Sequence, residues 1–237
     1  MGIFVIDGNI GSGKSSLLKY LKSNYVEKNK DNNDNSSKYS FKIIEELFIN
    51  EKNEMDPIIQ KFYDNPKEYA FLAQIKILMT HMKNKQYIDN YCQSTLTCKD
   101  TTDTKDTKEI LIFERSPLSC IHIFGEQLQA DNLIDKDQQE ITEEMNNNFG
   151  WIPENIIYIN TPSQECYNRI KKRGRNGEEK IPLDYLKHLE NRYNNLYNLK
   201  SGKITLSTGN IIKIWILDGN KSTEQLAEDL LNIINSD

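Results

Sequence analysis

The chain has 237 residues, of which 37% are hydrophobic, 9% are aromatic and 27% are charged. This composition can build one sizeable core, and it excludes a collagen-like or wholly disordered chain. The net charge of −5 suits a nucleic-acid backbone poorly, so we expect no nucleic-acid partner. No apolar run approaches the roughly 18 residues that cross a bilayer, and the first residues lack the basic segment of a signal peptide. We therefore expect a cytoplasmic protein with no membrane partner.

Short apolar runs alternate with longer amphipathic segments along the chain. Near-continuous Ile, Val and Phe, typical of parallel strands buried on both faces, predict strands at 3–6, 41–44, 110–113, 156–159 and 211–217. Helical periodicity predicts helices at about 14–24, 66–86, 183–197 and 224–234. Strands that alternate with helices predict an α/β fold, with a five-stranded parallel sheet flanked by helices.

Two polar tracts, residues 28–40 and 93–109, interrupt this alternation. Either tract has the composition of a linker between domains. The residues on both sides of each tract are needed for the one site described below, however. We therefore interpret both as surface loops of a single domain that spans residues 1–237.

A glycine-rich segment, GNIGSGKS, follows the first predicted strand and opens the first predicted helix. It satisfies the pattern GxxxxGK[ST], which predicts a phosphate loop (residues 8–15). Glycines let successive backbone N–H groups turn toward phosphate oxygens, and the start of the helix adds partial positive charge. Lys14 is then placed to reach the β- and γ-phosphates, and the Ser15 hydroxyl to bind Mg²⁺. The motif indicates a nucleoside triphosphate but leaves the acceptor open.

Carboxylates end two of the predicted strands. Glu45 and Glu46 follow the second strand, and Glu114 with Arg115 follows the third. Ligands bind at the carboxyl ends of strands in an open α/β sheet, so these side chains are expected beside the phosphate loop. A carboxylate there can bind Mg²⁺ or remove a proton from an attacking hydroxyl. Arg115 can neutralise phosphate or hold the basic carboxylate; a surface ion pair is the alternative.

A cationic segment follows the fourth predicted strand. Arg169 and Arg173 are four residues apart on a predicted helix, which Gly174 ends before Arg175 and Glu178. Arginines on such a turn suit a lid, at about residues 173–181, that closes over the transferring phosphoryl group. A merely solvated charged face is the alternative interpretation.

These motifs, in this order, resemble the deoxynucleoside kinases of the deoxycytidine, deoxyguanosine and mitochondrial-type thymidine kinase group. The resemblance spans nearly the whole chain. Its specific parts are the Glu-Arg-Ser triplet at 114–116 and the arginine-rich lid that continues to Ile-Pro-Leu at 181–183. The matching stretches are residues 7–16, 62–74, 113–124 and 146–186, together with the final strand and helix.

The resemblance implies a P-loop kinase that transfers the γ-phosphoryl group of ATP to the 5′-hydroxyl of a deoxynucleoside. It implies Mg²⁺ held by Ser15 and Glu114, and catalysis by Lys14, Arg115 and Glu46, with Glu45 as the alternative base. The implied ATP-binding residues are Gly8, Asn9, Ile10, Gly11, Ser12, Gly13, Lys14, Ser15, Ser16, Arg169, Arg173 and Arg175. The implied deoxynucleoside-binding residues are Tyr63, Gln74, His81, Arg115, Cys120, Phe124 and Glu178.

Within this resemblance, Tyr63 and Glu178 match the pair that binds the 3′-hydroxyl. Gln74 matches the amide that pairs with the nucleobase edge, and Phe124 matches the ring that stacks on the base. Members selective for deoxycytidine and purines carry Asp and Arg where this chain has Cys120 and His81. A small, weakly polar Cys leaves room for a 5-methyl group. We therefore expect a preference for thymidine or deoxycytidine, and the resemblance implies a homodimer.

Several alternatives share these features. A deoxypurine-preferring kinase of the same group would keep every phosphoryl-transfer residue. A nucleoside monophosphate kinase such as thymidylate kinase shares the loop, but it needs further basic residues over the acceptor phosphate. A GTPase-type switch would need NKxD and DxxG segments, which the chain lacks. A non-catalytic relic is disfavoured because every phosphoryl-transfer position is filled.

Overall fold

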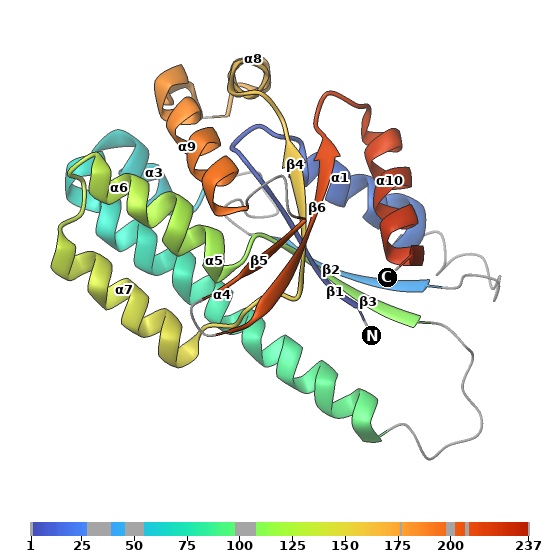
Figure 1. The fold of residues 1–237 in the computed structure, drawn as a ribbon. Coiled ribbons are helices and arrows are strands. Elements are labelled where there is room, and N and C mark those ends of the chain that lie inside the picture. Colours follow the sequence, from blue (N-terminus) through green and yellow to red (C-terminus); the bar gives the residue numbers. More distant parts are fainter. Residues whose placement is uncertain are drawn as a thin grey trace.

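The computed structural model describes residues 2–27, 39–45, 55–97, 108–175, 177–197, 202–206 and 209–236. Within them, a twisted sheet of six strands is covered by helices on both faces (Figure 1). The strand order is β2-β3-β1-β4-β6-β5. The strands are β1 (Gly2–Gly8), β2 (Tyr39–Ile44), β3 (Lys108–Glu114), β4 (Asn155–Asn160), β5 (Lys203–Thr205) and β6 (Ile211–Asp218).

All five predicted strands are confirmed, and they pair in parallel. The prediction of five strands was one short, because β5 adds a sixth that runs antiparallel to β6. This strand has only three residues, and two of them are exposed. It therefore carries none of the continuous apolar character that marks a buried strand.

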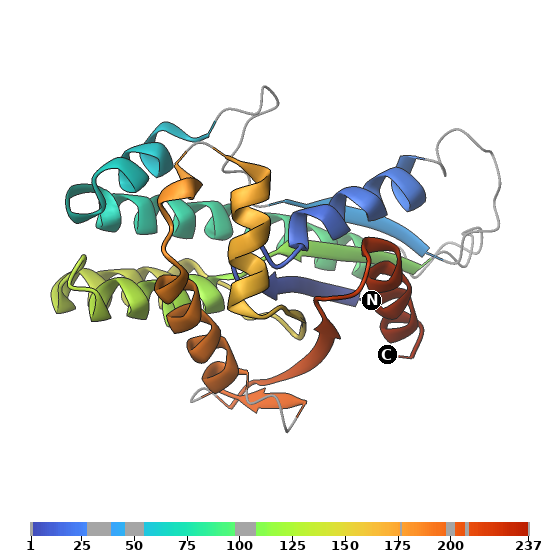
Figure 2. The same cartoon turned by 90° about the horizontal axis from the view of Figure 1, so that it is seen from above.

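The helices connect and cover these strands, as the view from above also shows (Figure 2). All four predicted helices are confirmed, although the first changes to a π-helical segment after Leu21. The helices before the third strand are α1 (Lys14–Leu21), η1 (Lys22–Glu27), α3 (Pro57–Asp64) and α4 (Pro66–Thr97). Those after it are α5 (Pro117–Ser119), η3 (Cys120–Gly125), α6 (Glu126–Ala130), α7 (Lys136–Phe149), α8 (Ser163–Arg173), η4 (Glu178–Lys180), α9 (Leu183–Leu196) and α10 (Thr223–Ser236).

Both polar tracts were predicted too long. Residues 39 and 40 already belong to β2, residues 93–97 end the long helix α4, and residues 108 and 109 begin β3. Residues 93–97 contain neither Gly nor Pro, so their polar sequence is compatible with the continuation of α4. The rest of each tract lies outside the described residues.

Strand β1 runs through the middle of the sheet and is buried along its whole length. Phe4 and Ile6 pack with α1 and α10 on one face, whereas Ile3 and Val5 pack with α9 and η3 on the other. Alternate residues thus serve two cores, and the sheet is held from both sides. The carboxyl end of β1 therefore opens onto the phosphate loop from a rigid base. None of the helices within the described ranges has the length and apolar character needed to cross a membrane.

Candidate active site

The phosphate loop connects β1 to α1, as predicted, and its glycines take conformations that other residues rarely adopt. Gly11 and Gly13 have φ angles of 79° and 109°. A Cβ atom on Gly11 would come within 2.6 Å of the backbone oxygen of Cys166 in α8. The Nζ atom of Lys14 donates to the backbone oxygens of Gly8 and Asn9, at 3.0 and 2.8 Å. The loop is thus folded tightly, with its lysine buried against its own carbonyl groups.

Residues 10–16 of the predicted ATP site line one large open cavity, of about 2190 Å³. The predicted arginines Arg169, Arg173 and Arg175 line it too, whereas Gly8 and Asn9 do not. The Asn9 amide faces α9 instead, where its Nδ2 donates to the backbone oxygen of Leu186 at 2.8 Å. Asn9 therefore ties the loop to the protein and does not face the cavity.

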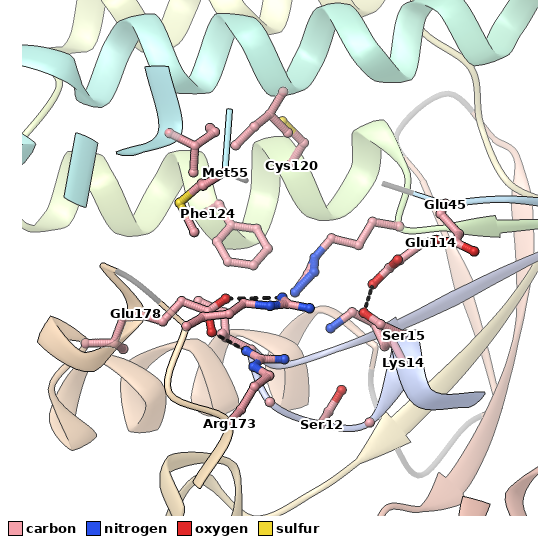
Figure 3. A pocket seen from close by; sticks show the side chains of 18 of the residues that line it. Ser12, Lys14, Ser15, Glu45, Met55, Glu114, Cys120, Phe124, Arg173 and Glu178 are labelled. Carbon is pink, nitrogen blue, oxygen red and sulfur yellow. Dashed lines mark hydrogen bonds and ion pairs between the residues drawn. The ribbon is translucent and has the colours of Figure 1, made fainter. Parts of the chain in front are cut away.

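The Ser15 hydroxyl donates to Oε1 of Glu114 at 3.0 Å, so the first turn of α1 meets the end of β3 (Figure 3). Glu45, which follows β2, also lines the cavity, and its carboxylate lies 4.0 Å from Nζ of Lys22. Ile44 of β2 pairs with Phe113 of β3. Glu45 and Glu114 come next on these neighbouring parallel strands, so both lie at the same edge of the sheet. Glu46, the predicted base, lies outside the described residues.

Arg115 has a left-handed backbone conformation, with a φ angle of 61°, which is uncommon for a residue with a side chain. Its backbone N–H donates to the oxygen of Ile6 at 3.0 Å, which fixes it against β1. Its buried guanidinium donates to the Gly8 oxygen at 3.1 Å and lies over the Phe124 ring, 4.8 Å from the centroid. Backbone strain of this kind concentrates at functional sites, where the surrounding structure maintains it.

The predicted lid follows α8, and its one buried carboxylate forms ion pairs with two arginines. Gly174 ends α8 in a left-handed conformation, as expected. The buried Glu178 carboxylate forms ion pairs with Arg173 and, at 3.4 Å, with Arg175. Arg169 points elsewhere: its guanidinium donates to the oxygens of Ser12 and Gly219 and pairs with Glu165.

Tyr63, on α3, lies beside the lid. Burial raises the pKa of its phenol well above the usual range, and the nearby Glu178 carboxylate raises this pKa further. The hydroxyl therefore stays protonated and can both donate and accept a hydrogen bond. A Cβ atom on Gly177 of the lid would lie 3.1 Å from the Tyr63 ring, so the lid packs closely on α3.

Cys120 and Phe124, both on η3, line the part of the cavity beyond Arg115. In Figure 3 the Phe124 ring projects into the cavity, with Cys120 beyond one edge and the charged groups beyond the other. Met55 and Ile77 add apolar surface there. This region has the size and apolar character of a site for a flat ring.

Two predicted substrate residues, Gln74 and His81, are buried in α4 and do not line the cavity. The Gln74 amide donates through Nε2 to the backbone oxygen of Cys120 at 2.7 Å. It therefore braces η3 rather than facing open space. His81 packs inside the helical layer, where its backbone oxygen accepts from Nε1 of Trp151 at 3.0 Å.

Several residues that line the cavity were not found from the sequence. Met55 lies just before α3, Ile77 is on α4, and Tyr185 is on α9. Lys221 follows β6, on the side of the cavity near Arg169. None of these residues belongs to a local motif, because the fold assembles them from distant segments. Of these four residues, only Tyr185 lies near a motif of the sequence, the Ile-Pro-Leu segment that ends the lid.

The donor atoms around Ser15 suit a hard cation. One hydroxyl and one carboxylate oxygen converge there, and Mg²⁺ takes one or two such protein ligands together with phosphate oxygens and water. Within the described residues, no group of three or more His, Cys, Asp or Glu side chains could hold a metal by itself. The chemistry thus fits a magnesium ion that arrives with a nucleotide.

The family model of the deoxynucleoside kinases matches residues 4–236. The chain is 28% identical to the putative kinase protein 143R of Invertebrate iridescent virus 6, over all of this chain and 98% of that protein. It is 28% identical to deoxycytidine kinase of Homo sapiens, over 95% of this chain and 86% of that enzyme. A structure of deoxyadenosine kinase from M. mycoides superimposes with a TM-score of 0.69 at 20% identity, covering 99% of this chain and 100% of that one. The chain therefore belongs to the deoxynucleoside kinase family, whose members transfer a phosphoryl group from ATP to a deoxynucleoside.

Proposed function

We propose that this kinase phosphorylates the 5′-hydroxyl of a pyrimidine deoxynucleoside, thymidine or deoxycytidine, with Mg·ATP as donor. One observation carries the proposal. The phosphate loop, the Glu114-Arg115 pair, the lid and the Phe124 pocket all line the same cavity. A deoxynucleoside with its base at Phe124 would direct its 5′-end toward Arg115 and the loop.

At the donor end, the loop would hold the ATP phosphates through its backbone N–H groups. Lys14 would turn one N–H toward the β- and γ-phosphates. Arg173 and Arg175 would add positive charge from the lid, where phosphoryl transfer spreads negative charge over three oxygens. Mg²⁺ bound by Ser15 and Glu114 would neutralise charge between the phosphates.

At the acceptor end, a carboxylate after β2 would accept the proton of the 5′-hydroxyl. We assign this role to Glu46, with Glu45 as the alternative, since Glu45 lines the cavity. Arg115 would hold the 5′-oxygen and orient the catalytic carboxylate. Most of the catalytic effect would come from positioning and charge stabilisation, because phosphoryl transfer needs little covalent chemistry from the protein.

The sugar and the nucleobase would bind between α3, η3 and the lid. Tyr63 and Glu178 would bind the 3′-hydroxyl, since a protonated phenol and a carboxylate can share one hydroxyl. The Phe124 ring would stack on the base. Gln74 would contribute to base recognition only after its amide turns away from Cys120, to which it donates here.

The preference for pyrimidines rests on what surrounds Cys120. Its side chain is small and uncharged, and His81 does not line the cavity, so neither side chain presents a fixed charge to the base. A pocket without a carboxylate at this position has no penalty against the carbonyl at position 4 of thymine. Met55 and Ile77 would contact a flat ring and its methyl group.

We also propose that the kinase forms a homodimer through α4 and α7, which pack together beside the sheet (Figure 1). Leu72 and Met79 of α4 are seven residues apart, and 46% and 47% of their surfaces are exposed. Residues at this spacing share one face of a helix. Ile141 and Phe149 of α7 are exposed as well, and such apolar surface is typical of a subunit interface.

The proposal is tested by incubating the purified protein with Mg·ATP and, separately, each of the four deoxynucleosides and thymidine monophosphate. Wild type is compared with Glu46→Gln and Glu45→Gln. We expect thymidine or deoxycytidine to give its monophosphate, and one of the two substitutions to abolish the reaction. Equal or faster conversion of a purine deoxynucleoside would overturn the pyrimidine preference. Conversion of thymidine monophosphate alone would overturn the assigned acceptor.

A further inference from the structure

Asp7, next to last in β1, carries a completely buried carboxylate. Its Oδ1 accepts from the backbone N–H of Gly8 at 2.7 Å and from the Tyr193 hydroxyl at 2.9 Å. Its Oδ2 accepts from the Tyr197 hydroxyl at 2.6 Å. A buried carboxylate requires such donors, because burial without them costs several kcal/mol. Tyr193 of α9 and Tyr197, the residue that caps this helix, thus satisfy the carboxylate.

The backbone oxygen of Gly8 is the meeting point of three side chains. It accepts from the Tyr193 hydroxyl at 3.1 Å, from Nζ of Lys14 at 3.0 Å and from the Arg115 guanidinium at 3.1 Å. Lys14 and Arg115 are the two cations that we place beside the reacting phosphoryl group. Both have further N–H donors, so each can keep this contact while it binds an oxygen of a substrate.

We propose that Asp7 and Tyr193 are positioning residues for phosphoryl transfer. The single proton of the Tyr193 hydroxyl lies between Oδ1 of Asp7 and the Gly8 oxygen, which share it. This shared contact sets the place of the Gly8 carbonyl group, on which Lys14 and Arg115 are aligned. This inference rests on the proposed roles of those two cations. Asp7 and Tyr193 do not line the cavity, so they act on the site from just behind its lining residues.

The surroundings keep the Tyr193 hydroxyl in one place. Its ring stacks on Tyr158, with centroids 5.3 Å apart, and both rings are buried. Burial, together with the Asp7 charge, raises the pKa of the Tyr193 phenol well above its usual range. The phenol therefore remains a hydrogen-bond donor at every pH at which the protein is assayed. A second contact, from Asn9 to Leu186, joins the loop to the same helix.

Tyr197 provides a matched control. It is fully buried at the C-terminal end of α9, where it caps the helix, and it donates to the other oxygen of Asp7. Its pKa is raised for the same reasons. The Tyr197 hydroxyl bonds to Asp7, whereas the Tyr193 hydroxyl also lies 3.1 Å from the Gly8 oxygen. Tyr193→Phe and Tyr197→Phe thus remove equivalent hydroxyl groups, but only the first releases the carbonyl group.

The experiment measures kcat and the KM values for ATP and for the deoxynucleoside in wild type, Tyr193→Phe, Tyr197→Phe and Asp7→Asn. Circular dichroism first establishes a temperature at which each variant is folded. We expect kcat/KM for ATP to fall about tenfold in Tyr193→Phe and Asp7→Asn, because small displacements of catalytic groups are costly. We expect Tyr197→Phe to stay within about threefold of wild type for both substrates.

Equal losses in Tyr193→Phe and Tyr197→Phe would overturn the inference, since they would show a shared structural role. If Tyr193→Phe does not fold, Asp7→Asn takes its place: a loss of kcat/KM for ATP no larger than that in Tyr197→Phe would then overturn the inference. If wild type phosphorylates no deoxynucleoside, the proposed function fails instead. ATP affinity, measured by equilibrium dialysis, then still tests whether Tyr193→Phe weakens the loop more than Tyr197→Phe.

Discussion

The Ser15 hydroxyl and the Glu114 carboxylate are 3.0 Å apart, although 99 residues separate them in the sequence. The sheet explains this contact, because β1 and β3 are neighbours in which Ile6 pairs with Glu114. The phosphate loop leaves β1 and leads into α1, and the first turn of α1 therefore lies beside the end of β3. We place Mg²⁺ at this contact.

This placement predicts a shared effect of Ser15→Ala and Glu114→Gln. We expect each change to lower kcat about 10²-fold, because Ser15→Ala removes an oxygen ligand of the ion and Glu114→Gln replaces a charged oxygen ligand with a weaker, neutral one. The double variant should be little worse than either single variant, since residues that act as a unit are not additive. The measurement is kcat as a function of Mg²⁺ concentration. Glu109→Gln, at an exposed position on the same strand, is the control and should leave kcat unchanged.

A second prediction concerns the base. Cys120→Asp places a carboxylate at the edge of the base pocket, where it repels the carbonyl at position 4 of thymine and accepts from the amine of cytosine. We expect kcat/KM for thymidine to fall at least about tenfold relative to that for deoxycytidine. Cys120→Ser keeps the size and adds no charge, so its ratio should stay near that of wild type. An unchanged ratio in Cys120→Asp would show that the base binds elsewhere.

A third prediction concerns the lid. Glu178→Gln removes the charge that pairs with Arg173 and Arg175, so both the 3′-hydroxyl contact and the lid arginines should lose their alignment. We expect at least about a tenfold loss of kcat/KM, together with a loss of about 2 kcal/mol in the free energy of unfolding. Steady-state kinetics and urea unfolding measure the two effects. Glu179→Gln changes the exposed neighbouring residue and should alter neither quantity.

Some parts of this architecture could be read from local patterns, and others could not. The phosphate loop and the ends of β2 and β3 are marked by short motifs beside apolar runs. Helix α7 has few apolar residues, so periodicity does not reveal it. Its capping box was a usable signal, because the Asp135 side chain accepts from the backbone N–H of Gln138 while the Gln138 side chain accepts from the backbone N–H of Asp135.

No sequence pattern predicts which way a buried side-chain amide points. Gln74 lies on a helix that was predicted, at the position that the family resemblance assigns to the base. Its amide nevertheless bonds to the Cys120 oxygen, because η3 brings that oxygen within 2.7 Å. Only the packing of two helices determines this contact, so no pattern within either helix contains it.

A fourth prediction concerns assembly. Met79→Glu places a charge on the exposed apolar face of α4, where burial against a second subunit would be unfavourable. We expect sedimentation velocity to give a dimer for wild type and a monomer for Met79→Glu. Ile211→Glu replaces another exposed apolar residue, on β6, and should leave the dimer intact. A wild-type protein that stays monomeric at every concentration would contradict the proposed interface.

A fifth prediction concerns alkaline pH. Burial raises the pKa of Tyr91 to about 12, and it raises the pKa values of Tyr193 and Tyr197 as well. The unfolded chain loses these protons near pH 10, whereas the folded protein retains them, so the unfolded state binds fewer protons above that pH. Stability should therefore fall as the pH rises from about 10 toward 12. Urea midpoints across this range measure the loss, and a midpoint that rises with pH would contradict the assignment.

The position of β1 between β3 and β4 has a consequence for how this enzyme can diversify. The segments that we assign to the base pocket follow β2 and β3, whereas Arg169 and Lys221, on the donor side, follow β4 and β6. Substitutions that reshape the base pocket can therefore fall on one half of the sheet, away from the phosphate loop and Arg169. A gene built this way can explore new substrates without first losing its phosphate donor.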